Sequence, residues 1–317
     1  MSQLPPLTTS PLGPVAASQR IAALDILRGA ALFGILLMNM ESYSGPMALG
    51  VTGIDPHWSG ADRIADALVY VLVQGKFFTL FSLLFGAGFA VMAMRAARAG
   101  RDFAPFFLRR TAALALFGLL HAVLVWSGDI LLSYALVSLV LLGLLQLPRT
   151  WLPPLGVLTY LAGGLLLLLM TVLMHAVLGD GAAEALETST ADALLQIADE
   201  REVLLHGSWL QASLYRLGDL ASALTGLLIV GPEILGMFLL GAWFTRSGAL
   251  AEPERFARPY ALLRWVAWPL GLAVAIGSAW WQPWQAPGAF SIELSMAWAL
   301  KARLRSSTLI ALSRFTP

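Results

Sequence analysis

Long apolar stretches alternate with short polar ones along this chain, a pattern typical of a protein that crosses a membrane several times. About 20 predominantly apolar residues are enough to span the hydrocarbon core as a helix. The first span is predicted from about Gly29 to Met40, continuing less regularly to Gly50, and the second from Gly75 to Met94. Further spans are predicted at about 154–178 and 219–244, in a segment that ends near Trp281, and at 289–300.

Two more apolar helices are predicted to fold back on each other through a turn at Ser127-Gly128. His121 lies inside the first helix and Asp129 at the start of the second. An ionisable side chain at membrane depth costs several kcal/mol or more, so His121 needs a partner or a functional role. Eight residues of helix would separate the pair by about 12 Å, so direct pairing requires the first helix to unwind before Trp126.

Three polar side chains are predicted at a similar depth. Asn39 and His121 each lie about 15 Å along their helices from the expected inner ends, and Glu233 about 21 Å from its outer end. We therefore expect a shared internal site near the middle of the bilayer. Gly231-Pro232 before Glu233 is predicted to interrupt the helix, as in midplane binding sites. Structural roles stay open: an interhelical hydrogen bond for His121, an N-cap for Asp129 and a simple kink at Pro232.

The distribution of basic residues predicts the topology. With the N-terminus in the cytoplasm, only Arg63, Lys76, Arg201 and Arg216 of the 20 Lys and Arg residues fall outside, which leaves 16 inside. Such an excess on one side fits the positive-inside rule. Residues 1–19 have no signal-peptide pattern and are predicted to be a mobile cytoplasmic tail. Residues 179–216 are acidic and polar, and are predicted to form a periplasmic excursion.

Several charged residues are candidates for binding. Asp25 and Arg28 are three residues apart and share a helix face, where they can form an interfacial ion pair. Alternatively, Arg28 and arginines of the basic loop 95–110, among them Arg109 and Arg110, hold the phosphates of a cytosolic ligand, a task suited to the planar guanidinium group. Topology alone also explains a basic inner loop. Two further candidates are Lys76, which can snorkel at the start of a span, and His57 in the outer loop.

Composition excludes several classes of protein. With 58% hydrophobic and 12% charged residues and a mean hydropathy of +0.75, the chain is not a soluble globular domain. The absence of cysteine excludes disulfides and thiol chemistry, and the four scattered histidines do not predict a metal centre. No nucleotide-binding or hydrolase motif is present, and no nucleic-acid partner is predicted.

Four stretches carry a resemblance to the bacterial YeiB-like, DUF418-containing membrane proteins. The resemblance implies a multi-pass protein of the bacterial inner membrane, with a transmembrane region at 20–178 and a DUF418-like region at 217–317. The stretches run from Arg20 to Asn39 with an R-x4-D-x2-RG opening, from Gly75 to Gly88, from Gly118 through His121 and Asp129 to Ala135, and from Leu235 to Gly248.

The R-x4-D-x2-RG opening is also similar to that of transmembrane acyltransferases, including relatives of heparan-glucosaminide N-acetyltransferase. This similarity implies an acyl-coenzyme A donor such as acetyl-CoA, with Arg28 near the coenzyme and Asn39 and a histidine at the transfer site. The histidine is either His121, from the YeiB-like motif, or His57. The family's closing helices are not recognised here, and Arg303 to Pro317 is expected to be a truncated or frame-shifted terminus.

The sequence therefore predicts an all-α polytopic bundle of seven or eight spans. Its predicted function is acyl transfer from acyl-coenzyme A to a glycan or lipid-linked acceptor in the envelope. His121 would act as general base, Asp129 would orient it, and Asn39 would stabilise the oxyanion. A permease that binds solute or protons at Asn39, His121 and Glu233 is the alternative, and a non-catalytic membrane scaffold is a third. Membrane lipid is an expected partner, and homo-oligomerisation is left open.

Overall fold

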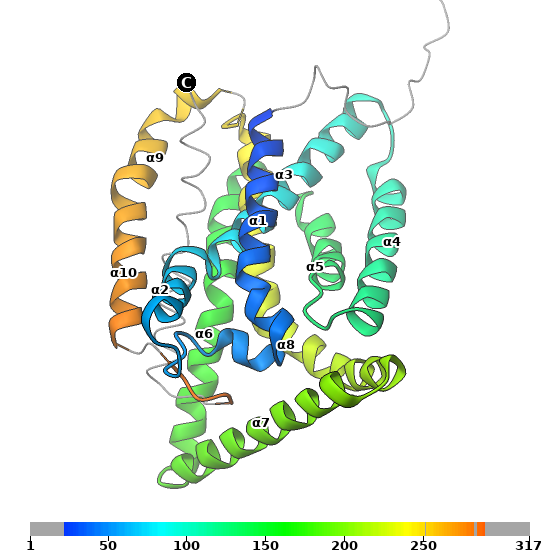
Figure 1. Cartoon of the computed structure of the whole chain (residues 1–317). Helices are drawn as coiled ribbons and strands as arrows, with labels where there is room; N and C mark the ends of the chain where they lie inside the picture. Colours follow the sequence, from blue (N-terminus) through cyan, green and yellow to red (C-terminus); the bar gives the residue numbers. More distant parts are fainter. Residues whose placement is uncertain (1–21, 251, 282–283, 289–317) are drawn as a thin grey trace, which may run out of the picture.

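The computed structural model describes residues 22–250, 252–281 and 284–288, and within these ranges it is helical, with no named strand (Figure 1). The predicted all-α bundle is confirmed. The predicted tail 1–19, the span 289–300 and the terminus 303–317 lie outside the described residues. The helices are α1 Ala22–Ser44, α2 Gly60–Leu68, α3 Lys76–Arg98, α4 Phe103–Leu124, α5 Leu131–Leu144, α6 Leu152–Leu178, α7 Gly181–His206, α8 Trp209–Ser247, α9 Ala257–Leu262 and α10 Trp268–Trp281. Short helical turns are η2 Met47–Val51, η3 Val69–Val73, η4 Arg149–Trp151, η5 Pro253–Phe256 and η6 Leu263–Ala267.

Five helical segments in the described ranges are long and apolar enough to cross a membrane. They are Gly60–Arg98, Phe103–Leu124, Arg149–Leu178, Trp209–Ser247 and Pro253–Trp281. Two further helices run alongside them: α5 is apolar but has only 14 residues, and α1 has 23 residues with charged side chains near its ends. Each predicted span that falls in the described residues therefore has a helix, and the bundle is that of a multi-pass membrane protein.

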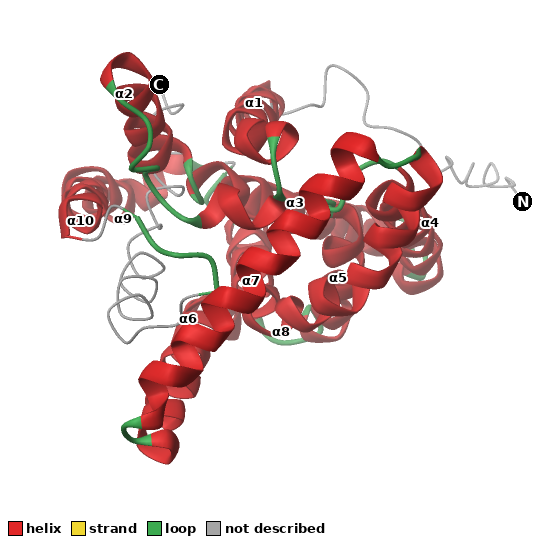
Figure 2. Cartoon of the chain, turned by 60° about the horizontal axis from the view of Figure 1, so that its bottom comes forward, coloured by secondary structure: helices red, strands yellow, loops and turns green. Residues whose placement is uncertain are grey.

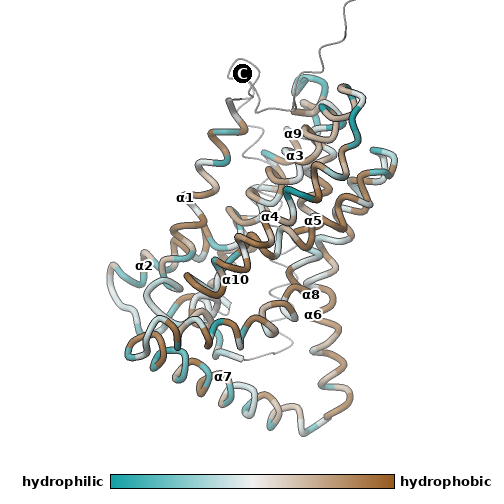
Figure 3. The backbone as a smooth tube through the Cα atoms, turned by 90° about the vertical axis from the view of Figure 1, so that its right-hand side faces the viewer, coloured by the Kyte–Doolittle hydropathy of each residue, from teal (hydrophilic) through white to brown (hydrophobic). Residues whose placement is uncertain are grey.

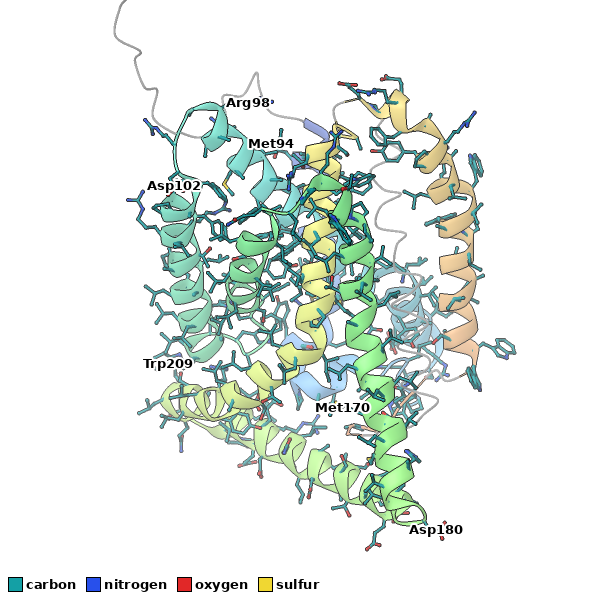
Figure 4. All side chains as sticks on the ribbon, turned by 180° about the vertical axis from the view of Figure 1, so that it is seen from behind. Met94, Arg98, Asp102, Met170, Asp180 and Trp209 are labelled. Carbon is teal, nitrogen blue, oxygen red and sulfur yellow. The ribbon has the colours of Figure 1, made fainter. Side chains whose placement is uncertain are left out.

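The bundle has two chemically different ends. One end, called here the basic end, carries the start of α1, the end of α3 and the start of α4, and lies at the top of Figure 1. At the opposite end, called the α7 end, α7 crosses beneath the bundle between α6 and α8 (Figures 1 and 2). Figure 4 shows Arg98 and Asp102 at the first end and Asp180 and Trp209 at the second. Hydrophobic residues follow the helices between the two ends, whereas hydrophilic and hydrophobic residues alternate along α7 (Figure 3).

Helix α8 forms the centre of the bundle because glycines let it approach α3 and α6 closely. A Cβ atom at Gly86 of α3 would collide with the backbone of Phe238, and one at Gly241 of α8 with the carbonyl oxygen of Leu83. A Cβ atom at Gly163 of α6 would likewise collide with the backbone of α8. Small residues at such crossings permit the van der Waals packing that holds helices together in lipid. The backbones of α3 and α8 therefore meet closely at Gly86 and Gly241.

The predicted break at Gly231-Pro232 does not occur. Helix α8 is one helix of 39 residues with Pro232 inside it. A proline removes one backbone hydrogen bond, but the adjoining turns keep theirs, so a helix packed on several sides continues through it. Glu233 follows Pro232 and is 1% exposed.

The basic loop predicted at 95–110 is mostly helical. Helix α3 continues to Arg98 and α4 begins at Phe103, so only 99–102 connects them. Asp102 caps α4 by accepting a hydrogen bond from the Ala104 N–H, at 3.1 Å. As a result, the arginines on either side of the turn have fixed directions set by two helices.

Candidate functional site

A cavity of about 770 Å³ lies at the basic end between α1, α3 and α4. Its charged lining consists of Asp25, Arg28, Arg95, Arg98 and Arg110. Its apolar lining includes Leu24, Phe81, Leu84, Phe85 and Phe89. On α3 the lining extends from Phe81 to Arg98, and these two residues are about 25 Å apart along the helix axis. The cavity therefore combines a strongly basic part with a long apolar part.

The guanidinium groups are held by local contacts. Arg28 Nη1 donates to Asp25 Oδ1 at 3.1 Å, so the predicted ion pair on α1 forms. Gly88 of α3 leaves room for this arginine, because a Cβ atom there would lie 3.0 Å from Arg28 Nη2. Arg110 Nη1 contacts Met92 Sδ at 2.8 Å across the α3–α4 corner. Four cations and one carboxylate in a single cavity leave an excess of positive charge, which favours an anionic ligand.

Three of the four predicted donor-site residues line this cavity, namely Arg28, Asp25 and Arg110. Arg109 is exposed and is not part of the lining. Arg95 and Arg98 were not singled out from the loop, but they line the cavity. Their spacing of three residues, and the spacing of seven from Gly88 to Arg95, place them on the face of α3 that turns to α1. This periodicity was the sequence signal that could have identified them.

His121 and Asp129 form a direct pair near the α7 end. Helix α4 ends at Leu124, and the N–H groups of Val125 and Trp126 both donate to the His121 carbonyl oxygen, at 3.0 and 2.9 Å. The helix thus unwinds before Trp126, as direct pairing required. His121 Nδ1 lies 2.9 Å from Asp129 Oδ2. The carboxylate side chain is only 2% exposed, whereas the histidine side chain is 41% exposed.

The second carboxylate oxygen of Asp129 has a structural role. Oδ1 accepts a hydrogen bond from the Leu132 N–H at 2.8 Å, in the first turn of α5. The predicted cap and the predicted histidine partner are therefore both present. Gly118 permits this arrangement, because a Cβ atom there would collide with the backbone of Leu132. With Nδ1 held by Asp129, the Nε2 atom of the partly exposed His121 ring is the one left for a substrate.

Asn39 and His121 lie farther along their helices than predicted. Helices α1 and α4 begin at Ala22 and Phe103, seven and eight residues before the expected starts. Asn39 and His121 consequently lie about 26 and 27 Å along their helices from the basic end, near the α7 end. Glu233 lies about 21 Å along α8 from Ser247 and is buried beside Gly163 of α6. The first two therefore share a level, but it is not the middle of the bundle.

Aromatic residues not identified from the sequence surround the His121–Asp129 pair. Trp126 packs on the His121 ring with centroids 6.5 Å apart and on Tyr43 of α1 at 4.7 Å. Trp209 at the start of α8 donates its Nε1–H to the Leu124 carbonyl oxygen, at 3.0 Å. These contacts join α1, the α4–α5 turn and α8 around the pair. The α1 contact to this turn is made by Tyr43, one helical turn beyond Asn39.

The two other predicted candidates, Lys76 and His57, do not line the cavity. Lys76 is the first residue of α3 at the α7 end. His57 has a side chain 87% exposed and its Nδ1 lies 2.7 Å from Asp55 Oδ1. Burial acts to raise the pKa of the Asp55 carboxyl, but hydrogen bonds from the His57 N–H and ring outweigh it and lower this pKa below its ordinary value.

Helix α5 connects the cavity with the histidine pair. Tyr134 lies in the first turn of α5, five residues after Asp129. Its ring centroid is 5.8 Å from that of Phe81 and 5.3 Å from that of Phe85, both of which line the cavity. The apolar part of the cavity therefore approaches the same helix that positions Asp129. Within the described residues, no group of three or more His, Asp or Glu side chains could hold a metal ion.

Comparison with known proteins identifies two relatives that match most of the chain. YxaH of Bacillus subtilis, an uncharacterised protein, is 35% identical over 289 residues, covering 85% of this chain and 67% of YxaH. YeiB of Escherichia coli, also uncharacterised, is 34% identical over 282 residues, covering 84% of this chain and 66% of YeiB. An uncharacterised 39.9 kDa protein of Bacillus acidopullulyticus is 34% identical over 139 residues, covering 44% of this chain and 38% of that protein. The chain thus spans about two thirds of the length of YxaH and YeiB. No family model and no solved structure matches.

Proposed function

The chain belongs to the family of the uncharacterised proteins YxaH and YeiB, and from its own site we propose that it is an acyl-CoA-dependent acyltransferase. In this proposal the basic end faces the cytoplasm of a bacterial cell, as the distribution of arginines predicts. The acceptor is a hydroxyl or amine of a glycan or lipid-linked molecule on the opposite side of the inner membrane. The resemblance of the R-x4-D-x2-RG opening to that of transmembrane acyltransferases supports the same proposal.

The observation that carries the proposal is the cavity at the basic end. Its four arginines provide bidentate donors for the phosphates of coenzyme A. Its apolar part, from Leu84 to Phe81, provides a surface for the pantetheine arm and the acyl group. A ligand that is highly anionic at one end and apolar at the other matches both halves, whereas a simple inorganic anion would use only the first.

The His121–Asp129 pair supplies the acid–base chemistry. In the proposed step, the acceptor oxygen or nitrogen attacks the thioester carbonyl carbon while His121 Nε2 takes the proton of that acceptor atom. The carbon–sulfur bond then breaks, and the thiolate of coenzyme A leaves and takes up a proton. Asp129 fixes the ring through Nδ1 and stabilises the imidazolium. Asn39, at a similar level on α1, is proposed to donate to the developing oxyanion.

The experiment is coenzyme-A release by the purified chain supplied with acetyl-CoA and an envelope-lipid extract. We expect release by the wild type and a loss of at least about 100-fold in His121→Ala. His57→Ala is the matched control, because it removes an exposed histidine at the same end and is expected to keep wild-type activity. Loss in His57→Ala alone would transfer the general-base role to that histidine, and no release by any form would contradict the proposal.

Glu233 favours a second candidate function, proton-coupled transport. A carboxyl that is 1% exposed in the central helix is a common feature of proton pathways through membranes. Under this alternative, Glu233→Gln abolishes pH-driven uptake of a solute by proteoliposomes, and the chain binds no coenzyme A. Coenzyme-A binding with normal acyl transfer in Glu233→Gln would exclude it.

A further inference from the structure

Toward the α7 end, no charged side chain among the described residues lines the cavity. Its arginines and Asp25 lie at the basic end, whereas Phe81, Leu84 and Phe85 line the part that is farthest along α3. Leu84 is 1% exposed, so its side chain is sequestered from the surrounding membrane. A ligand that reaches this part must present apolar atoms there, because a polar group would lose its hydration without a partner.

A close-packed aromatic wall ends the apolar part. Behind Phe81 and Phe85 stands Tyr134 of α5, which is 1% exposed. Phe238 of α8 stacks on Phe85 with centroids 4.6 Å apart and meets Tyr134 edge-on at 5.1 Å. The Tyr134 hydroxyl is anchored by Ser82 and by the Phe78 carbonyl oxygen. Rings fixed from three helices leave little freedom to move, so the wall has a definite position.

Resting on the proposed function, we infer that the acyl group of the donor lies against this wall and that Phe85, backed by Tyr134, sets the longest acyl chain that binds. Each additional buried methylene should raise affinity about fourfold. Once the acyl chain reaches the wall, further methylenes would have to displace packed side chains, and the affinity stops rising. Phe85 is thus a specificity-determining residue, and the binding site selects among acyl-CoA donors by chain length.

The test is a titration of the full chain in lipid nanodiscs with coenzyme A and with acetyl-, butanoyl-, hexanoyl- and octanoyl-CoA by calorimetry. For the wild type we expect affinity to rise with chain length and then to level off or fall within the series. Phe85→Ala should shift the acyl length at which the affinity stops rising by at least two carbons, and coenzyme A itself should still bind. Phe85→Leu is a milder second variant should the alanine protein fail to fold.

Two control variants isolate the wall. Phe117→Ala makes the same change on the outer surface of α4, where the side chain is 65% exposed, and should keep the wild-type limit. Tyr134→Phe keeps the ring behind Phe85 and loses only its anchors at Ser82 and the Phe78 carbonyl oxygen, so its limit should shift less than that of Phe85→Ala. Coenzyme-A binding with an unmoved limit in both Phe85 variants would overturn the inference while leaving the donor site intact. Absence of coenzyme-A binding in every form would overturn the proposed function and this inference with it.

Discussion

Asp129 serves two neighbours at once, and this dual contact determines what its substitution does. One oxygen holds the His121 ring and the other caps the first turn of α5 through the Leu132 N–H. Removing the side chain leaves a backbone donor and a ring nitrogen without their partner in a nearly buried position. Changing it to an amide preserves the cap but alters the hydrogen-bonding partner that the ring requires.

We predict that Asp129→Ala lowers the free energy of unfolding by about 1–2 kcal/mol, whereas Asp129→Asn changes it little. The amide variant is the informative one for function, because Asp129→Asn presents an N–H group to His121 Nδ1, which keeps the ring proton on Nε2 and blocks the base. Coenzyme-A release should therefore fall about 100-fold or more. Thermal unfolding and the release assay measure the two effects. Equal stability of both variants would contradict the capping role.

The sequence predicted Arg28, Asp25 and Arg110 at the cavity but could not separate Arg110 from Arg109. Consecutive residues on a helix point about 100° apart, so only the rotation of α4 about its axis decides which of the two faces the cavity. That rotation depends on packing against α3, which no local pattern specifies. The pairing of His121 with Asp129 was conditional on an unwound helix end, and only the structure supplied it.

At the scale of the element, the α4–α5 hairpin depends on one glycine. We predict that Gly118→Ala destabilises the protein by about 1–3 kcal/mol, because its Cβ atom collides with the Leu132 backbone. Gly143→Ala is the control: it lies in α5, where a Cβ atom meets nothing within 4 Å, and should be neutral or stabilising by about 0.5–1 kcal/mol. Thermal unfolding of both variants gives the comparison, and similar destabilisation by the two would contradict the account of the hairpin.

Helix α7 should make stability depend on pH through Glu200, which accepts a hydrogen bond from the Met47 N–H at 3.3 Å. Burial, aided by Asp219, raises the pKa of this carboxyl above its ordinary value near 4.5, although Met47 and Arg216 act to lower it. The unfolded chain therefore releases this proton at lower pH than the folded one. As pH rises from about 4.5 through the raised pKa, the folded state loses stability relative to the unfolded state.

We predict that Glu200→Gln removes this loss, so that its stability relative to the wild type increases with pH. The gain should stay below about 1 kcal/mol, because the site is only partly buried and solvent screens it. Thermal unfolding from about pH 4 to about pH 8 covers the titration of this carboxyl and measures the difference, with Glu187→Gln on the exposed surface of α7 as control. A difference that is flat or decreases with pH would contradict the prediction.

The sequence predicted which segments form helices, but it did not predict where these helices begin and end. Apolar length identified each span in the described residues, because a membrane helix must bury its backbone hydrogen bonds internally. The ends were misplaced because charged residues such as Arg98 were assigned to loops, although long basic side chains can continue a helix beyond the apolar core. The same error of seven or eight residues placed Asn39 and His121 too close to the starts of their helices.

At the scale of the whole molecule, the basic end and the α7 end should face opposite sides of the membrane. The chain lacks cysteine, so single cysteines report on topology without a background. We predict that Arg101→Cys, in the α3–α4 turn, reacts with a membrane-impermeant maleimide only in inside-out vesicles. Thr188→Cys on α7 should react only from the periplasmic side, in spheroplasts. Labelling of both positions from one side would contradict this placement of the two ends.

A donor site in the basic cavity is tested by the affinity of the purified chain for coenzyme A in wild type, Arg98→Gln and Arg109→Gln, measured by calorimetry. The two substitutions remove the same charge from the same end, but only Arg98 lines the cavity. We predict binding by the wild type, at least about tenfold weaker binding in Arg98→Gln, and nearly wild-type binding in Arg109→Gln. No binding by the wild type, or equal weakening by both substitutions, would contradict a donor site in the basic cavity.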